Sequence, residues 1–169
     1  MNLKLFFLLA VLILPATTLS AQQKQRKEEF IGYRHRGVVY GEILPNGARD
    51  LGGGLLSDEN YGVSRFAKGK KRMLWLEKIT SHDKKGVPNW EVKDVIVINK
   101  PKKNQEFLFS YASPCTENGA ADLDLIVLAE FRARQKSYKV LQAWRADLLN
   151  EKFQQVPAIE GIRCEYVER

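Results

Sequence analysis

The chain has 169 residues, of which 44% are hydrophobic, and its formal net charge at pH 7 is +7. This composition is typical of a folded domain with a packed core. Its two cysteines and two histidines lie far apart in the sequence, so the chain lacks the finger-like ligand spacing of a structural zinc site.

The N-terminal residues 1–21 predict a secretory signal peptide. Lys4 supplies a short positive start, the apolar run Leu5–Leu14 follows, and small residues come after it. The run is shorter than the roughly 20 residues that span a bilayer, and it precedes no cysteine for a lipid anchor. We therefore expect a periplasmic or extracellular protein without a transmembrane segment. Residues 22–29 then form a flexible polar lead-in, and 30–169 form a single globular domain.

The two cysteines, Cys115 and Cys164, are expected to pair. Thiols in one small domain usually form a disulfide in an oxidising compartment. In the chain-entropy model, closing this loop contributes about 4 kcal/mol of stability. The alternative is two independent buried thiols.

Short segments of alternating apolar and polar residues dominate the chain between turns. In residues 123–132 every odd position is apolar, whereas helical spacing from Leu123 meets charged residues at Glu130 and Arg134. Strands are predicted, in chain order, over residues 30–43, 73–80, 90–98, 107–111, 123–132 and 162–166. The pattern favours an all-β fold, an antiparallel sandwich or a small up-and-down barrel of about eight short strands.

Residues 137–150 are ambiguous. Tyr138, Val140, Trp144 and Ala146 follow strand spacing, but Tyr138, Trp144 and Leu148 also follow helical spacing. An α+β fold with 137–150 helical is therefore the alternative.

The glycine-rich stretch at residues 51–62, LGGGLLSDENYG, resembles a ligand loop at first sight. It lacks the third glycine of a dinucleotide fingerprint and the Gly-Lys-Ser/Thr ending of a P-loop. Its acidic residues are adjacent rather than alternating, unlike those of a calcium loop. We expect a flexible connector whose glycines adopt positive φ, with a ligand loop as the alternative.

Three carboxylates are weak candidates for a metal or for acid–base chemistry. Asp122 and Asp124 alternate with a leucine and would share one face of a starting strand, and Asp58 lies in the glycine-rich stretch. The simpler interpretation is a solvated strand entry. No resident metal and no cofactor is predicted.

Neither histidine has the context of a catalytic base. His35 lies between Arg34 and Arg36, and we expect these cations to lower its pKa. His82 lies between a serine and an aspartate, but residues adjacent in sequence do not converge as a triad does.

Basic residues in predicted turns are the strongest functional indication. Two of these turns, at 68–72 and 100–103, are expected at one end of a simple sheet, with Lys84 and Lys85 at the other. The candidate ligand-contacting residues are Lys68, Lys70, Lys71, Arg72, Lys102, Lys103, Trp75 and Trp90. They suit an anionic glycan or a lipid headgroup, with lysines pairing to phosphate and aromatic rings stacking on sugar. Nucleic acid is disfavoured because there is no aromatic–basic single-strand platform.

Three functional hypotheses follow. The first is a secreted or periplasmic non-enzymatic binding domain that contacts anionic envelope components through basic loops. The second is a metal-dependent hydrolase using Asp58, Asp122, Asp124 or His82. The third is a structural envelope protein without a small ligand. The oligomeric state is left open by the sequence.

Overall fold

The computed structural model describes residues 27–109 and 115–165, which fold into antiparallel β-sheets. The predicted all-β class is confirmed. The predicted signal peptide and most of the lead-in lie outside the described residues.

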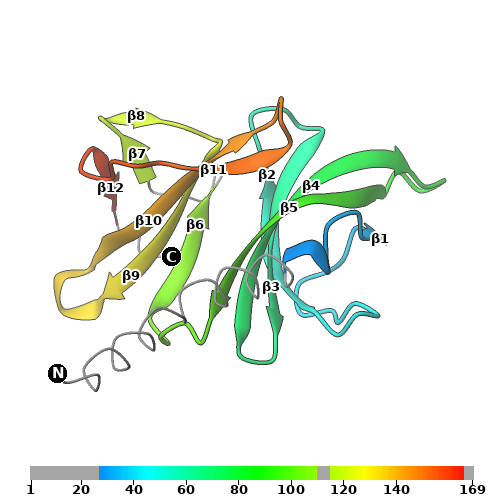
Figure 1. Ribbon diagram of the computed structural model, residues 1–169, viewed down its shortest axis with the longest axis horizontal. Helices are drawn as coiled ribbons and strands as arrows, with labels where there is room; N and C mark the ends of the chain where they lie inside the picture. Colours follow the sequence, from blue (N-terminus) through cyan, green and yellow to red (C-terminus); the bar gives the residue numbers. More distant parts are fainter. Residues whose placement is uncertain (1–26, 110–114, 166–169) are drawn as a thin grey trace, which may run out of the picture.

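The largest sheet has five strands and curls as a half-barrel. Its order is β1 (Arg34–Arg36), β5 (Pro88–Asn99), β4 (Lys71–His82), β3 (Tyr61–Lys68) and β2 (Arg49–Leu55). Figure 1 shows it on one side of the molecule, with the second sheet on the other. The second sheet has the order β11 (Lys152–Gln155), β10 (Ser137–Asp147), β9 (Leu125–Arg132) and β6 (Gln105–Phe109).

The run Met73 to Leu76 in β4 is apolar at every position because both faces of the curled sheet are covered. Leu74 and Leu76 pack in a cluster with residues of the second sheet, such as Ile126. Met73 and Trp75 point to the opposite face and pack in a different cluster. A strand buried on both faces loses the apolar–polar alternation, which is why its pattern is less regular in sequence.

The segment from Phe30 to Ala48 covers the second face of the curled sheet. Phe30 and Leu44 are buried there against Phe66 and Trp75. The strand predicted over residues 30–43 is therefore wrong for most of its length, since β1 is the one strand within it and Ile43 adds a single isolated bridge to Arg49. The rest is an irregular connection that supplies apolar side chains to the core and forms isolated backbone hydrogen bonds with β2 and β5, such as that from the Asp50 N–H to the Glu42 carbonyl at 2.8 Å.

The alternative of a helix over residues 137–150 is wrong, because β10 pairs with both β9 and β11. A bulge between Val140 and Gln142 interrupts the register with β9. Before the bulge, Tyr138 and Val140 face one core cluster; after it, Ala143 faces that cluster and Trp144 the other. The extra residue shifts the alternation by one position and produces the mixed spacing in the sequence.

A third, small sheet carries the disulfide. Its order is β12 (Ile162–Cys164), β7 (Cys115–Glu117) and β8 (Ala120–Ala121). Cys115 and Cys164 are register partners on neighbouring strands, their Cα atoms are 4.0 Å apart, and they form the predicted disulfide. Across the described part of the chain, no helix is both long enough and apolar enough to cross a bilayer.

Candidate functional site

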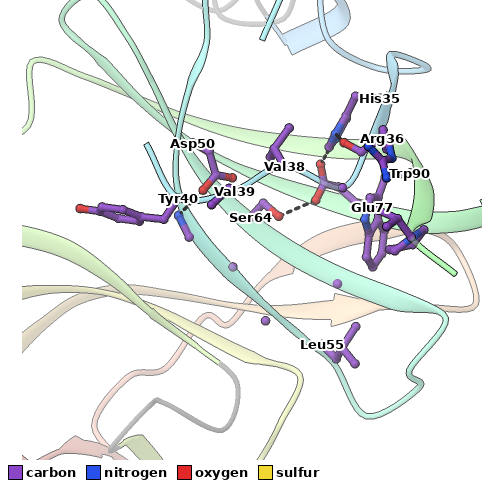
Figure 2. Close-up of a pocket in the computed structure, with 17 residues that line it drawn as sticks. His35, Arg36, Val38, Val39, Tyr40, Asp50, Leu55, Ser64, Glu77 and Trp90 are labelled. Atoms are coloured by element: carbon purple, nitrogen blue, oxygen red, sulfur yellow. Dashed lines mark hydrogen bonds and ion pairs between the residues drawn. The ribbon is translucent and has the colours of Figure 1, made fainter. Parts of the chain in front are cut away.

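A cavity of about 560 Å³ opens at one end of the curled sheet. It is lined by the connection after β1, the glycines of β2, the first residues of β3 and β5, and Glu77 of β4. Figure 2 shows these side chains around the opening. The volume falls within the range typical of small-molecule sites, roughly 300–1,000 Å³.

The glycines predicted to form a flexible connector belong instead to strand β2, which pairs with β3. Of Gly52, Gly53 and Gly54, only Gly52 has a positive φ, +87°, at a break in register between Asp50 and Gly53. At Gly53 a Cβ atom would lie 2.5 Å from the Val63 carbonyl oxygen and 2.7 Å from Oγ of Ser64. The glycines therefore allow β2 to approach β3 closely and leave the cavity wall without side chains.

A buried hydrogen-bonded group forms the base of the cavity. Nε2 of His35 lies 2.7 Å from Oε1 of Glu77, and the Ser64 hydroxyl donates to Oε2 of Glu77 at 2.6 Å. Figure 2 shows the Glu77 carboxylate between these two partners. Glu77 comes from the centre of β4, Ser64 from β3 and His35 from β1, so tertiary structure alone brings them together.

The protonation of His35 follows from its partners. Nδ1 lies 2.8 Å from the Arg36 carbonyl oxygen, which only accepts, so Nδ1 carries a hydrogen. Burial lowers the pKa of His35, but the hydrogen bond and the charge of Glu77 outweigh burial, and the pKa is raised. The expectation that Arg34 and Arg36 lower it is wrong, because they pair instead with Glu91 and Asp83.

This group is not a serine-hydrolase triad. In such a triad the histidine stands between the serine and the carboxylate and takes the serine proton. Here the carboxylate of Glu77 stands between Ser64 and His35. The arrangement orients a buried carboxylate and does not activate the hydroxyl as a nucleophile. His82, the other histidine, is exposed at the end of β4.

Asp50 is the second buried carboxylate of the cavity, at 4% exposed. Its Oδ1 accepts a hydrogen bond from the Gly52 backbone N–H at 2.7 Å. Burial raises the pKa of Asp50, and the neighbouring charge of Glu77 adds to the rise. A buried carboxylate of this kind is stabilised when a hydrogen-bond donor or a cation binds to it.

Apolar side chains stand exposed beside the polar base. Val39 is 74% exposed and Tyr40 is 76% exposed, both in the connection after β1, and Leu55 of β2 is 37% exposed. Trp90 lines the cavity from β5. Trp90 was predicted to act with the basic turns, but it lies at this cavity instead.

The basic turns lie together at one end of the molecule, away from the turn that carries Lys84 and Lys85 (Figure 1). The Lys100 N–H donates to the Lys70 carbonyl at 2.9 Å, joining the β5–β6 turn to the β3–β4 turn. The Phe131 N–H donates to the Asn104 carbonyl at 2.8 Å, joining the β5–β6 turn to the end of β9.

We call these three neighbouring turns the basic end. Its cationic residues are Lys68, Lys70, Lys71, Arg72, Lys100, Lys102, Lys103, Arg132, Arg134, Lys136 and Lys139. The cations of the β9–β10 turn were not among the sequence candidates, because residues 137–150 were not assigned to a strand and no turn was placed before them.

Several predicted ligand-contacting residues already have internal partners. Lys68 pairs with Glu29 at 2.8 Å, and Lys102 lies 3.6 Å from Glu130. By contrast, Lys70, Lys71, Arg72 and Lys103 form no salt bridge with any residue in 27–109 or 115–165. Trp75 is 0% exposed in the core, so its ring is not available to a ligand.

The candidate metal carboxylates are engaged in turns and sheet contacts. Asp124 accepts from the N–H and hydroxyl of Ser57, and Asp122 accepts from Arg145. Asp58 accepts from Asn60. Within the portion of the chain that the structure describes, no three His, Cys, Asp or Glu side chains are grouped to hold a metal ion.

Comparison with known proteins identifies no relative: no family model, no curated protein and no solved structure matches the chain.

Proposed function

We propose that the protein is a non-enzymatic binding domain that acts outside the cytoplasm and docks on an anionic lipid surface through its basic end. The observation that carries this proposal is the convergence of basic turns far apart in sequence, with Lys70, Lys71, Arg72 and Lys103 unpaired by carboxylates of the described residues. Each Lys or Arg near an anionic membrane surface contributes about 1 kcal/mol of attraction.

A lipid surface suits the basic end better than a glycan chain. Sugar recognition commonly adds an aromatic ring that stacks on the sugar, but Trp75 is buried and Trp90 lies at the cavity. The exposed large apolar side chains of the described segments are Ile31, Val39, Tyr40, Ile43, Leu55 and Leu149, none of which is in the basic turns. Lysine ammonium groups at hairpin tips pair as point charges with headgroup phosphates.

Location outside the cytoplasm is supported by the disulfide and by the N-terminal sequence pattern. The net positive charge supports the docking part of the proposal, because it attracts the protein to anionic surfaces in general.

Vesicle co-sedimentation tests the proposal. The protein should bind vesicles containing phosphatidylglycerol and not vesicles of phosphatidylcholine alone, and binding should weaken steeply between low and physiological salt. Replacing Lys102 and Lys103 by Glu should reduce binding at least about tenfold.

The matched control replaces Lys84 and Lys85 by Glu. These two lysines are adjacent, exposed and in a hairpin turn, so the net charge changes equally but at the opposite end. An equal loss in both variants would mean nonspecific attraction and would contradict a docking end. If the protein were retained on heparin but did not bind vesicles, the partner would be an acidic glycan and not a lipid. If it bound neither, a structural role would be favoured.

A further inference from the structure

We propose that the cavity at the end of the curled sheet binds a small organic cation, a primary amine or a guanidine with an apolar portion, and that the Asp50 carboxylate receives the charged group. The proposal is independent of docking on lipid, because the cavity and the basic end share none of the residues on which the two arguments depend.

The first observation is an incompletely satisfied carboxylate inside the cavity. Asp50 is 4% exposed, and Gly52 donates to its Oδ1. Throughout the described residues, nothing donates to Oδ2 of Asp50 and no cation forms a salt bridge with it. An ionised carboxylate buried with one hydrogen bond is costly, and a cation entering the cavity would offset that cost.

The cations of the chain that lie nearest are engaged elsewhere. His35 forms a hydrogen bond with Glu77, and Arg36 forms a salt bridge with Asp83 at 2.8 Å. Arg65 lies over the Phe109 ring, 5.4 Å from its centroid, and its Nε donates to the Gly52 carbonyl oxygen at 3.5 Å. Its charge therefore acts on Asp50 without forming a salt bridge with it. The chain therefore provides a binding site for positive charge without filling it.

The second observation is the shape and lining of the cavity. The glycines of β2 line the cavity without side chains of their own, and the places that Cβ atoms of Gly53 and Gly62 would take are already filled by Ser64 and by the Trp90 ring. Trp90 and the exposed Val39 and Tyr40 supply apolar and aromatic surface around the opening. A cavity that offers both a carboxylate and an aromatic ring has the two groups that recognise the charged and apolar portions of an organic cation.

Other classes of ligand fit less well. An anion would meet two buried carboxylates, Asp50 and Glu77. A neutral polyol would donate hydrogen bonds but would leave the charge of Asp50 uncompensated. The geometry therefore favours a cation over both.

Calorimetric titration of the purified chain tests the assignment with two probes of the same shape. 2-Phenylethylamine should bind at least about tenfold more tightly than 2-phenylethanol, which lacks the charge. Agmatine is the probe for the guanidine form of the proposed ligand. Asp50→Asn, which keeps the Oδ1 acceptor for Gly52, should reduce amine affinity to that of the alcohol. Glu59→Gln removes an equal charge from an exposed position in the neighbouring turn and should leave amine affinity unchanged.

Amide chemical shifts of the wild-type chain keep the test decisive even where Asp50→Asn does not fold. Amine-induced shifts should centre on Gly52, Gly53 and Gly62. The proposal is overturned by equal affinity for amine and alcohol, by full amine binding in folded Asp50→Asn, by shifts centred elsewhere, or by no amine binding at all.

Discussion

His35 and Glu77 form a buried pair across the curled sheet, with Nε2 2.7 Å from Oε1 and side chains that are 5% and 2% exposed. His35 comes from the short strand β1 and Glu77 from the centre of β4, and β1 contacts the sheet edge through β5 alone. The pair therefore holds the N-terminal connection over the cavity and orients the carboxylate beneath it.

Removing the charge of Glu77 should weaken the fold and release His35. We expect Glu77→Gln to lower the free energy of unfolding by about 3 kcal/mol, because it breaks a buried charged pair. The pKa of His35 should fall as well, since Glu77 is the main group that raises it. Urea denaturation and NMR titration of the His35 ring measure the two effects. Glu59→Gln, at an exposed position, should change stability by no more than about 0.5 kcal/mol.

The raised pKa of His35 makes stability depend on pH. The folded protein holds this proton more tightly than the unfolded chain, whose histidine titrates near 6.5. The contribution is therefore fully present below pH 6.5 and is lost as pH rises through the folded pKa. Denaturation midpoints measured from pH 5 to 9 should show this decline in the wild type and a smaller one in His35→Gln. Parallel curves for the two proteins would contradict the assignment.

Glu151 should make stability sensitive to acid. The Lys78 side chain, followed by Tyr61 and Lys93, lowers the pKa of Glu151 to about 2 against the opposing effect of burial. Its contribution is present above the ordinary value of 4.5 and is lost as pH falls from there through about 2. Glu151→Gln should remove part of the acid-induced loss, measured as the unfolding free energy at pH 7 minus that at pH 3. A variant with the same difference as the wild type would exclude this role.

Gly53 should not tolerate a side chain. Gly53→Ala places a Cβ 2.5 Å from the Val63 carbonyl oxygen, and relieving that overlap should cost about 1–3 kcal/mol. Gly37→Ala, also at the cavity, puts its Cβ 3.4 Å from the Val87 side chain, an ordinary contact. Thermal unfolding should therefore show a clear loss for the first variant and little change for the second.

Loss of the disulfide should destabilise the protein substantially. Cys115 and Cys164 close a loop with a sequence separation of 49, for which the chain-entropy model gives about 4 kcal/mol. Urea denaturation of the double Cys→Ala variant tests this value. Full stability of the wild type after reduction would show that the bond contributes little.

Strand periodicity in single segments predicted much of the second sheet and part of the first. Residues 123–132 contain β9, and residues 90–98 lie within β5. Alternation is a local property of an extended chain with one face more buried than the other, so one sequence displays it. No strand was predicted over β2, β3 or β11, the bulge in β10 left residues 137–150 open between strand and helix, and the prediction was wrong in the connection after β1.

The cavity was missed because its polar members come from separate strands. Glu77 follows an apolar run, and Asp50 is separated from three glycines by a single leucine. A charged residue near such a pattern was the available signal. The glycines match no phosphate or metal motif, and it is the close approach of β2 to β3 that requires them. The inward-facing position of Glu77 in a predicted strand could have indicated a site, but it could not have identified His35 and Ser64 as its partners.

The sequence by itself determined the all-β class and the disulfide pairing, because local alternation and the presence of just two thiols leave few choices. It also carries the expectation of export. Only the tertiary structure decided that the β9–β10 turn lies beside the basic turns at 68–72 and 100–103, which tryptophan is buried, and that His35, Ser64 and Glu77 meet. Those relationships depend on strand order and on the path of the connection between strands, which no local pattern encodes.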